Sequence, residues 1–120
     1  MENMSAELKN ERGTVTIANN VLAKLAGYAA SKCYGVVGMA VRGGKDGLAR
    51  LLNRENIDRG IKIHVEENKV DILLCIIVEY GVNITTVGES IRQNVKYHLE
   101  EMTGMEVRSV TVRVESIRVD

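Results

Sequence analysis

The feature that most constrains the fold is the segment KVDILLCIIVE, residues 69–79. Every second residue from Val70 to Val78 is apolar, and Leu73, Cys75 and Ile77 make the alternate positions apolar as well. Successive side chains of a strand point to opposite faces of the sheet, so this segment predicts a strand that is apolar on both faces. Such a strand lies at the centre of its sheet or is covered on both sides.

The preceding segment, GIKIHVE, alternates between apolar and polar residues. Ile61, Ile63 and Val65 fall on one face of a predicted strand, and the residues between them are polar. The polar pair Glu67-Asn68 separates this strand from the next and suits a hairpin turn. The two strands are therefore expected to pair as a hairpin.

Two longer segments have helical spacing. Residues 18–33 predict a first helix from the recurrence of Val21, Leu22, Leu25, Ala29 and Cys33. The second predicted helix has Asn83 as its N-terminal cap and Gly104 as its C-terminal stop. Its apolar stripe comprises Ile84, Val87, Ile91, Val95, Leu99 and Met102.

The remaining segments complete the predicted order of elements. GTVTI, residues 13–17, reads as a first strand, and residues 106–117 read as a last strand with Val110, Val112 and Val114 inward. DGLARLLNR predicts a short helix with Leu48, Leu51 and Leu52 on one face, whereas residues 36–40 are too short for periodicity to decide. The prediction is a single α+β domain over residues 13–120, preceded by a flexible polar arm over residues 1–12. Its order is β-α-(short segment)-α-β-β-α-β, with helices packed on a mostly antiparallel sheet.

Composition and the N-terminus limit the classes of function. The chain has equal numbers of basic and acidic residues, no Phe or Trp, and only 4 Tyr. A nucleic-acid platform that stacks bases on aromatic side chains is therefore disfavoured. No uncharged apolar run is long enough to insert into a membrane, and the polar N-terminus lacks the pattern of a signal peptide. We expect a cytoplasmic protein.

No pattern of residues predicts catalysis, a metal site or a cofactor. His64 and His98 stand far apart in sequence, and no close-spaced pair of Cys or His provides the ligands of a zinc site. No serine occurs in a Gly-x-Ser-x-Gly turn, and no carboxylate pair stands out. Cys33 and Cys75 are expected to be reduced thiols, because cytosolic cysteines behave as small apolar residues. The expectation is a protein that is not an enzyme.

The glycine-rich loop between the first predicted helix, residues 18–33, and the predicted short helix is the candidate functional site. It comprises Arg42, Gly43, Gly44, Lys45, Asp46 and Gly47. A phosphate-binding loop would need Ser or Thr after the lysine, and Asp46 stands there instead and would repel phosphate. The interpretations left open are a structural connection, a loop that docks a partner protein, and a nucleic-acid clamp.

The nucleic-acid interpretation is the alternative function. Gly44-Lys45-Asp46-Gly47 matches the Gly-x-x-Gly loop with which KH domains clamp single-stranded nucleic acid. Residues 34–43 separate the loop from the first helix, whereas a KH domain joins the two directly. The neutral net charge also counts against nucleic acid as a partner, because nucleic-acid binders carry excess basic charge.

The charges are unevenly distributed, which gives one of two routes to self-association. Residues 42–62 carry six basic and three acidic side chains, a net charge of +3, and residues 63–120 carry six basic and ten acidic side chains, a net charge of −4. Complementary patches of this kind can steer one subunit toward another. The last strand offers the second route, because an unpaired strand edge can accept a neighbouring strand.

Several short sequence motifs, found in this order along the chain, resemble those of a known family. They are Gly35-Val36-Val37-Gly38-Met39, Val78-Glu79-Tyr80-Gly81 and Glu101-Met102-Thr103-Gly104, within a match from about Gly13 to Val119. Together they resemble the alkaline shock protein family, small cytosolic proteins of Gram-positive bacteria tied to the cell-envelope stress response. Lys45-Asp46-Gly47-Leu48 and Tyr34 resemble the short housekeeping branch of that family.

The resemblance implies a non-enzymatic assembly and interaction module with no catalytic residues. It implies a homo-oligomer that a separate, membrane-anchored protein partner holds near the membrane. The protein would then be cytoplasmic and peripheral to the membrane through that partner, without inserting into the membrane itself.

Overall fold

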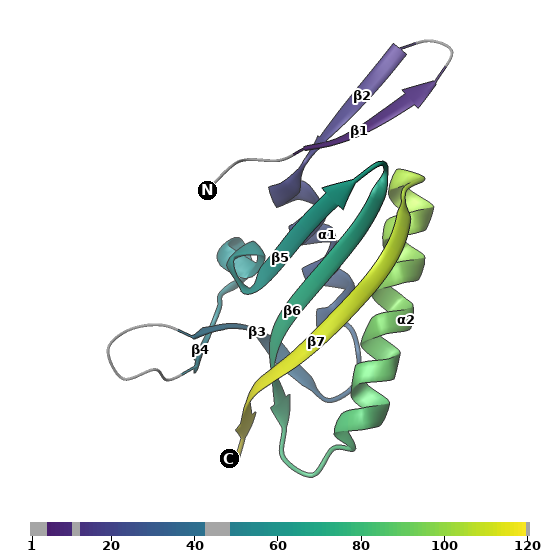
Figure 1. Ribbon diagram of the computed structural model, residues 1–120. Helices are drawn as coiled ribbons and strands as arrows, with labels where there is room; N and C mark the ends of the chain where they lie inside the picture. Colours follow the sequence, from purple (N-terminus) through teal and green to yellow (C-terminus); the bar gives the residue numbers. More distant parts are fainter. Residues whose placement is uncertain (1–4, 11–12, 43–48, 120) are drawn as a thin grey trace.

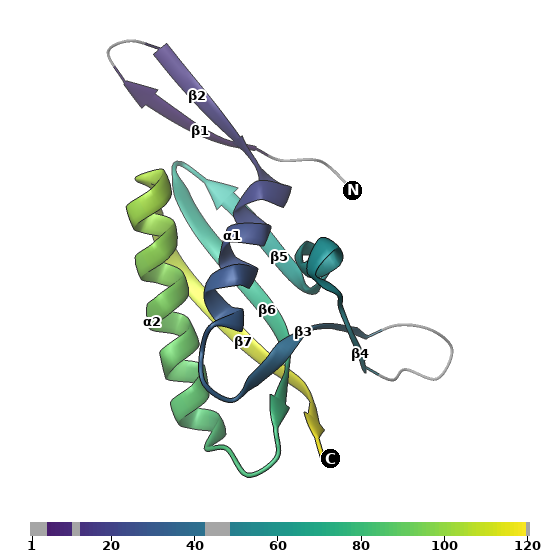
Figure 2. The same ribbon diagram turned by 180° about the vertical axis from the view of Figure 1, so that it is seen from behind.

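The computed structural model describes residues 5–10, 13–42 and 49–119, and its fold is of the expected α+β class. Helices α1 and α2 lie side by side on one face of a twisted sheet, and the described residues place no α-helix on the other face (Figures 1 and 2). The elements in order are β1 (Ser5–Asn10), β2 (Gly13–Ala18), α1 (Asn19–Ser31), β3 (Val36–Arg42), β4 (Ala49–Leu51), the 3₁₀ helix η1 (Arg54–Gly60), β5 (Ile61–Glu66), β6 (Lys69–Glu79), α2 (Ile84–Thr103) and β7 (Glu106–Arg118).

Strand β6 is the centre of the sheet, as its doubly apolar sequence predicts. β5 and β3 pair antiparallel with successive parts of β6, and β7 pairs with β6 in parallel over its whole length. The hairpin of β5 and β6 pairs Glu66 with Lys69. Its turn residues Glu67 and Asn68 have φ angles of 50° and 63°, which are the values that a tight hairpin turn requires.

Helix α2 is the crossover that a parallel pair of strands requires, because it connects the end of β6 to the start of β7. Its predicted caps are both confirmed. The Asn83 side chain accepts a hydrogen bond from the Thr86 backbone N–H at 3.0 Å. Gly104 ends the helix with a left-handed φ of 74°, a conformation that costs glycine little.

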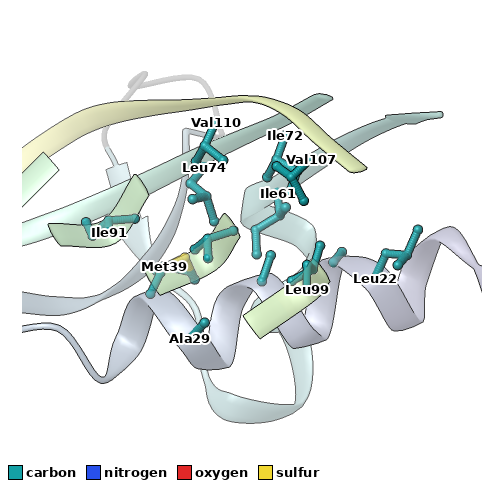
Figure 3. Close-up of a cluster of buried hydrophobic side chains, with 14 of the residues drawn as sticks. Leu22, Ala29, Met39, Ile61, Ile72, Leu74, Ile91, Leu99, Val107 and Val110 are labelled. Carbon is teal, nitrogen blue, oxygen red and sulfur yellow. The ribbon is translucent and has the colours of Figure 1, made fainter. Parts of the chain in front are cut away.

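The core lies between the two helices and the sheet (Figure 3). The predicted stripe of α2 is buried in its middle, where Val95 has no exposed surface. Both ends of the predicted stripe are solvent-exposed, because the buried positions follow a strict spacing of four residues to Thr103. The helix predicted from the spacing of Val21, Leu22 and Leu25 is confirmed as α1, in which Leu22 is fully buried and Val21 is 46% exposed.

The predicted short helix over DGLARLLNR is wrong. Ala49–Leu51 form strand β4, which pairs antiparallel with β3 so that Leu51 lies opposite Ala40. The next residue donates its backbone N–H to the Met39 carbonyl at 2.9 Å. Strand pairing with β3 overrides the local helical spacing, and Leu48 lies outside the described residues.

The structure adds β1, β3 and β4 to the four predicted strands. Ser5–Asn10, within the segment expected as an arm, form β1 and pair antiparallel with β2. Residues 36–40, which periodicity leaves undecided, belong to β3. The hairpin of β1 and β2 projects from one end of the molecule (Figure 1).

Candidate functional site

The glycine-rich loop connects two paired strands. β3 ends at Arg42, which lies opposite Ala49 of β4, so residues 43–48 join the two strands of an antiparallel pair. Gly43, Gly44, Lys45, Asp46 and Gly47 lie outside the described residues, and the docking role of the loop stays a prediction. A KH-type clamp needs this loop between two helices, and here β3 precedes it and β4 follows it.

The described histidines and cysteines form no metal centre. Both His64 and His98 are exposed, on β5 and α2 respectively. In residues 5–10, 13–42 and 49–119, no three His, Cys, Asp or Glu side chains converge on one point. Cys33 and Cys75 are free thiols. Cys33 is buried, where its sulfur accepts a hydrogen bond from the Asn94 side chain at 3.1 Å and thereby ties α1 to α2.

The face of the sheet opposite the two α-helices carries the strongest electrostatic contacts among the described residues. The Arg108 guanidinium binds the Asp71 carboxylate through two of its nitrogens, one of them Nε at 3.1 Å, and the Ser109 hydroxyl donates to the same carboxylate at 2.7 Å. These bonds, Arg108 first, lower the pKa of Asp71 from 3.8 to about 2. Arg108 also reaches Glu66 at 3.7 Å, so this cluster links β5, β6 and β7.

Cys75 lies on the same face and is half-buried. Burial raises the pKa of its thiol, and the adjacent Glu115 raises it further. A nucleophilic cysteine needs the opposite shift, because the thiolate is the reactive form. The raised pKa favours the protonated thiol of Cys75 over the thiolate.

A groove between α1 and α2 is the clearest candidate binding surface. It has a volume of about 380 Å³ and an apolar floor that includes Leu25, Ala29 and Met102. Met102 is 66% exposed, and Val21 extends the same surface along α1. Lys32 lines the groove and supplies positive charge at its margin.

Sequence reasoning missed this surface, although the signal was present. Helix α1 has one charged residue, Lys24, and its outer positions 21, 25 and 28 are as apolar as its inner ones. Past its first residue, the polar side chains Asn20, Lys24 and Ser31 form one narrow stripe, so the apolar surface of α1 is wider than the side that packs on the core. The outer face of α1 is open to solvent, with Val21 at 46% and Tyr28 at 40% exposure.

Neither α1 nor α2 is both long enough and apolar enough to cross a membrane, and no other described helix is either. Charged residues interrupt α2 throughout its length.

Comparisons with known proteins agree on one family. Residues 7–119 match the model of the alkaline shock protein 23 family, which is described as having a cell envelope-related function. The chain is 41% identical to the uncharacterized protein YloU of Bacillus subtilis over 117 residues, which is 97% of this chain and 98% of that protein. It is 31% identical to the stress response regulator gls24 homolog of Streptococcus pyogenes over 98% of this chain and 66% of that protein.

No solved structure matches the chain. The family match spans almost all of the described residues, from β1 to β7. The resemblance to alkaline shock proteins is thereby confirmed, and the chain belongs to the alkaline shock protein 23 family, whose function is related to the cell envelope.

Proposed function

We propose that this protein is a non-enzymatic interaction module of the cell envelope, which self-associates and is held near the membrane by a separate, anchored protein. The observation that carries the proposal is the open apolar groove between α1 and α2. Exposed apolar surface of this kind, rimmed by polar residues, is typical of a protein–protein contact.

The groove favours a helical segment of the anchored partner. Two antiparallel helices with an apolar floor between them can accept a third amphipathic helix. Lys32, at the C-terminal end of α1 and in the lining of the groove, favours acidic residues on the polar side of the partner helix. The partner is thus a membrane-anchored protein that presents an amphipathic, acidic helix.

The experiment is a membrane sedimentation assay with the full chain and membranes from a Gram-positive bacterium. The wild-type protein should sediment with these membranes, and it should stay in the supernatant when the membranes have been treated with protease. Replacing Val21 and Met102 together by Glu should abolish sedimentation, because Met102 lines the groove and Val21 is exposed one turn before Leu25 on α1, so the change charges the groove and the apolar surface beside it.

The matched control is Tyr34→Glu, which changes an exposed residue beyond the end of α1 and should leave sedimentation intact. Equal loss in this control would contradict a role for the groove. Sedimentation with protein-free lipid vesicles would contradict the anchored partner. If the protein sediments together with RNA and no longer sediments after nuclease treatment, the result would instead favour the nucleic-acid alternative.

A further inference from the structure

Strand β7 has an unpaired edge. Among the described residues β7 pairs only with β6, so its other edge has no neighbouring strand. The strand register between β7 and β6 skips Arg108 and Glu115, which are bulge positions of β7. Ser109–Val114 form the regular stretch between these two positions. Unpaired N–H and C=O groups along such a stretch can accept a further strand.

The free edge lies in a groove beneath α2. This groove has a volume of about 230 Å³ and is lined by Gln93 and Lys96 of α2 and by Val107 and Val110 of β7. Figures 1 and 2 show α2 running beside β7 along this edge. If the partner at this edge were a sheet covered by helices, those helices would collide with α2. The edge can therefore accept a single strand or a two-stranded hairpin more easily than a helix-covered sheet.

The chain itself contains a hairpin of this kind. β1 and β2 pair only with each other among the described residues and form a separate two-stranded sheet. An isolated two-stranded hairpin is marginally stable in water, so further pairing would stabilise it. β1 contacts β5, which lies across β6 from β7, and this position separates the hairpin from the free edge of its own chain (Figure 1).

We propose that β1 of one copy adds as a strand to the free edge of β7 in a second copy. This inference rests on the self-association proposed above and assigns its contact surface. β1 has 6 residues, the same number as the regular stretch Ser109–Val114 of the acceptor edge, so most of β1 can pair within that stretch. Sheet pairing also requires apolar positions to lie opposite apolar positions, which places Ala6 and Leu8 opposite valines of β7.

The charges select among the registers that remain. With Leu8 opposite Val112 in an antiparallel pair, Glu7 lies opposite Arg113. A parallel pair with Leu8 opposite Val114 gives the same partner for Glu7. An antiparallel pair with Leu8 opposite Val114 would instead place Lys9 opposite Arg113 and oppose like charges, which destabilises a strand pair. An antiparallel pair with Leu8 opposite Val110 opposes no charges, so opposite charges favour the registers that place Glu7 opposite Arg113, and this is the contact that the test examines.

The donor strand and the acceptor edge are different surfaces of the chain. Each copy can donate β1 to one neighbour and accept β1 from another. A head-to-tail contact of this kind builds rings if the rotation closes and open filaments if it does not.

The test is a charge exchange measured by sedimentation equilibrium of the full chain. Glu7→Lys and Arg113→Glu should each weaken self-association about tenfold, because each opposes like charges across the new strand pair. An equimolar mixture of the two variants should recover association, because each hairpin can then meet an opposite charge on the other variant. Lys62→Glu, on the exposed face of β5, is the matched control and should leave association unchanged.

The outcomes separate this inference from the proposed function. Wild-type self-association that neither variant weakens would overturn the β1–β7 contact and leave self-association standing. Weakening without recovery in the mixture would also overturn the contact, because a general loss of stability does not depend on the partner. A wild-type protein that stays monomeric at every concentration would overturn both. Circular dichroism of each variant identifies any loss of fold.

Discussion

The Asp71 carboxylate is the residue whose surroundings most alter its chemistry. It accepts hydrogen bonds from Arg108 and Ser109, two neighbours on β7. Arg108 occupies the extra position in the register between β6 and β7, and an extra residue of this kind turns a side chain in a new direction. The irregularity in β7 thus places the guanidinium over Asp71.

This cluster should make stability depend on acidity. The pKa of Asp71 is about 2 in the folded chain and 3.8 without these bonds, so the unfolded chain binds the proton first as pH falls. The stabilisation by Asp71 is complete above the pKa that this residue has in the unfolded chain. It is lost as the pH falls through the pKa that Asp71 has in the folded chain. Asp71→Asn should therefore be less stable than the wild type at neutral pH, and urea unfolding should show the difference narrowing as pH falls toward 2.

The control for this prediction is Glu101→Gln, which removes an exposed carboxylate near the end of α2. The difference in free energy of unfolding between Glu101→Gln and the wild type should vary less with pH. A difference between Asp71→Asn and the wild type that stays constant from neutral pH to pH 2 would contradict the assigned bonds.

Among the secondary-structure elements, the sequence of α2 identifies the side that faces the core, and the sequence of α1 does so less completely. α2 has charged residues on its outer side, and its buried positions Val87, Ile91, Val95 and Leu99 follow one stripe. α1 has a polar stripe only at Asn20, Lys24 and Ser31, so its sequence does not identify which part of its broad apolar surface is buried. Packing against α2, β3, β5 and η1 determines which side of α1 faces the core.

Two glycines should respond in opposite directions to replacement by alanine. Gly88 lies inside α2, and a Cβ there would meet nothing within 4 Å. Gly88→Ala should stabilise the fold by about 0.5–1 kcal/mol, because alanine loses less backbone entropy in a helix. At Gly60 a Cβ would lie 2.6 Å from the Ala40 carbonyl oxygen, and Gly60→Ala should destabilise the fold by about 1–3 kcal/mol.

Thermal unfolding and urea unfolding of the two variants measure both effects. Equal destabilisation by the two substitutions would contradict the open surroundings of Gly88. An unchanged stability of Gly60→Ala would contradict the close approach of η1 to β3, which packs the end of the 3₁₀ helix against the sheet.

The molecule as a whole is elongated. Its radius of gyration is 14.8 Å, and its principal extents are 53 × 31 × 20 Å. A compact chain of this length would have a radius of gyration of about 13.6 Å. The projecting hairpin of β1 and β2 accounts for the excess (Figure 2).

Self-association should largely survive high salt. Screening shortens electrostatic interactions to about 3 Å at 1 M salt, which would suppress steering between the basic and acidic parts of the chain. Backbone hydrogen bonds between strands and apolar contacts are not screened in this way. Light scattering across a salt series should therefore show a particle mass that stays above the monomer at 1 M salt. A fall to the monomer mass would assign the association to the charged patches.

Elements whose signals lie within a few residues could be predicted from the amino-acid sequence. The hairpin of β5 and β6 follows from strict alternation and a two-residue polar turn, and α2 follows from one long stripe between Asn83 and Gly104. β7 follows from its alternating valines. Each of these signals is local, because side-chain period and turn chemistry depend on neighbouring residues alone.

Features that depend on a distant partner were settled by the packing of the folded chain. Leu48, Leu51 and Leu52 have a helical spacing in the sequence, but Ala49–Leu51 form a strand because β3 supplies hydrogen bonds beside them. Val21 faces solvent because packing, and not period, selects the inner side of an apolar helix. Among the described residues, the parallel pairing of β7 with β6 leaves one edge of β7 without a neighbouring strand, and no residue within β7 encodes which edge remains open. The surfaces proposed for binding therefore arise from how the elements pack together.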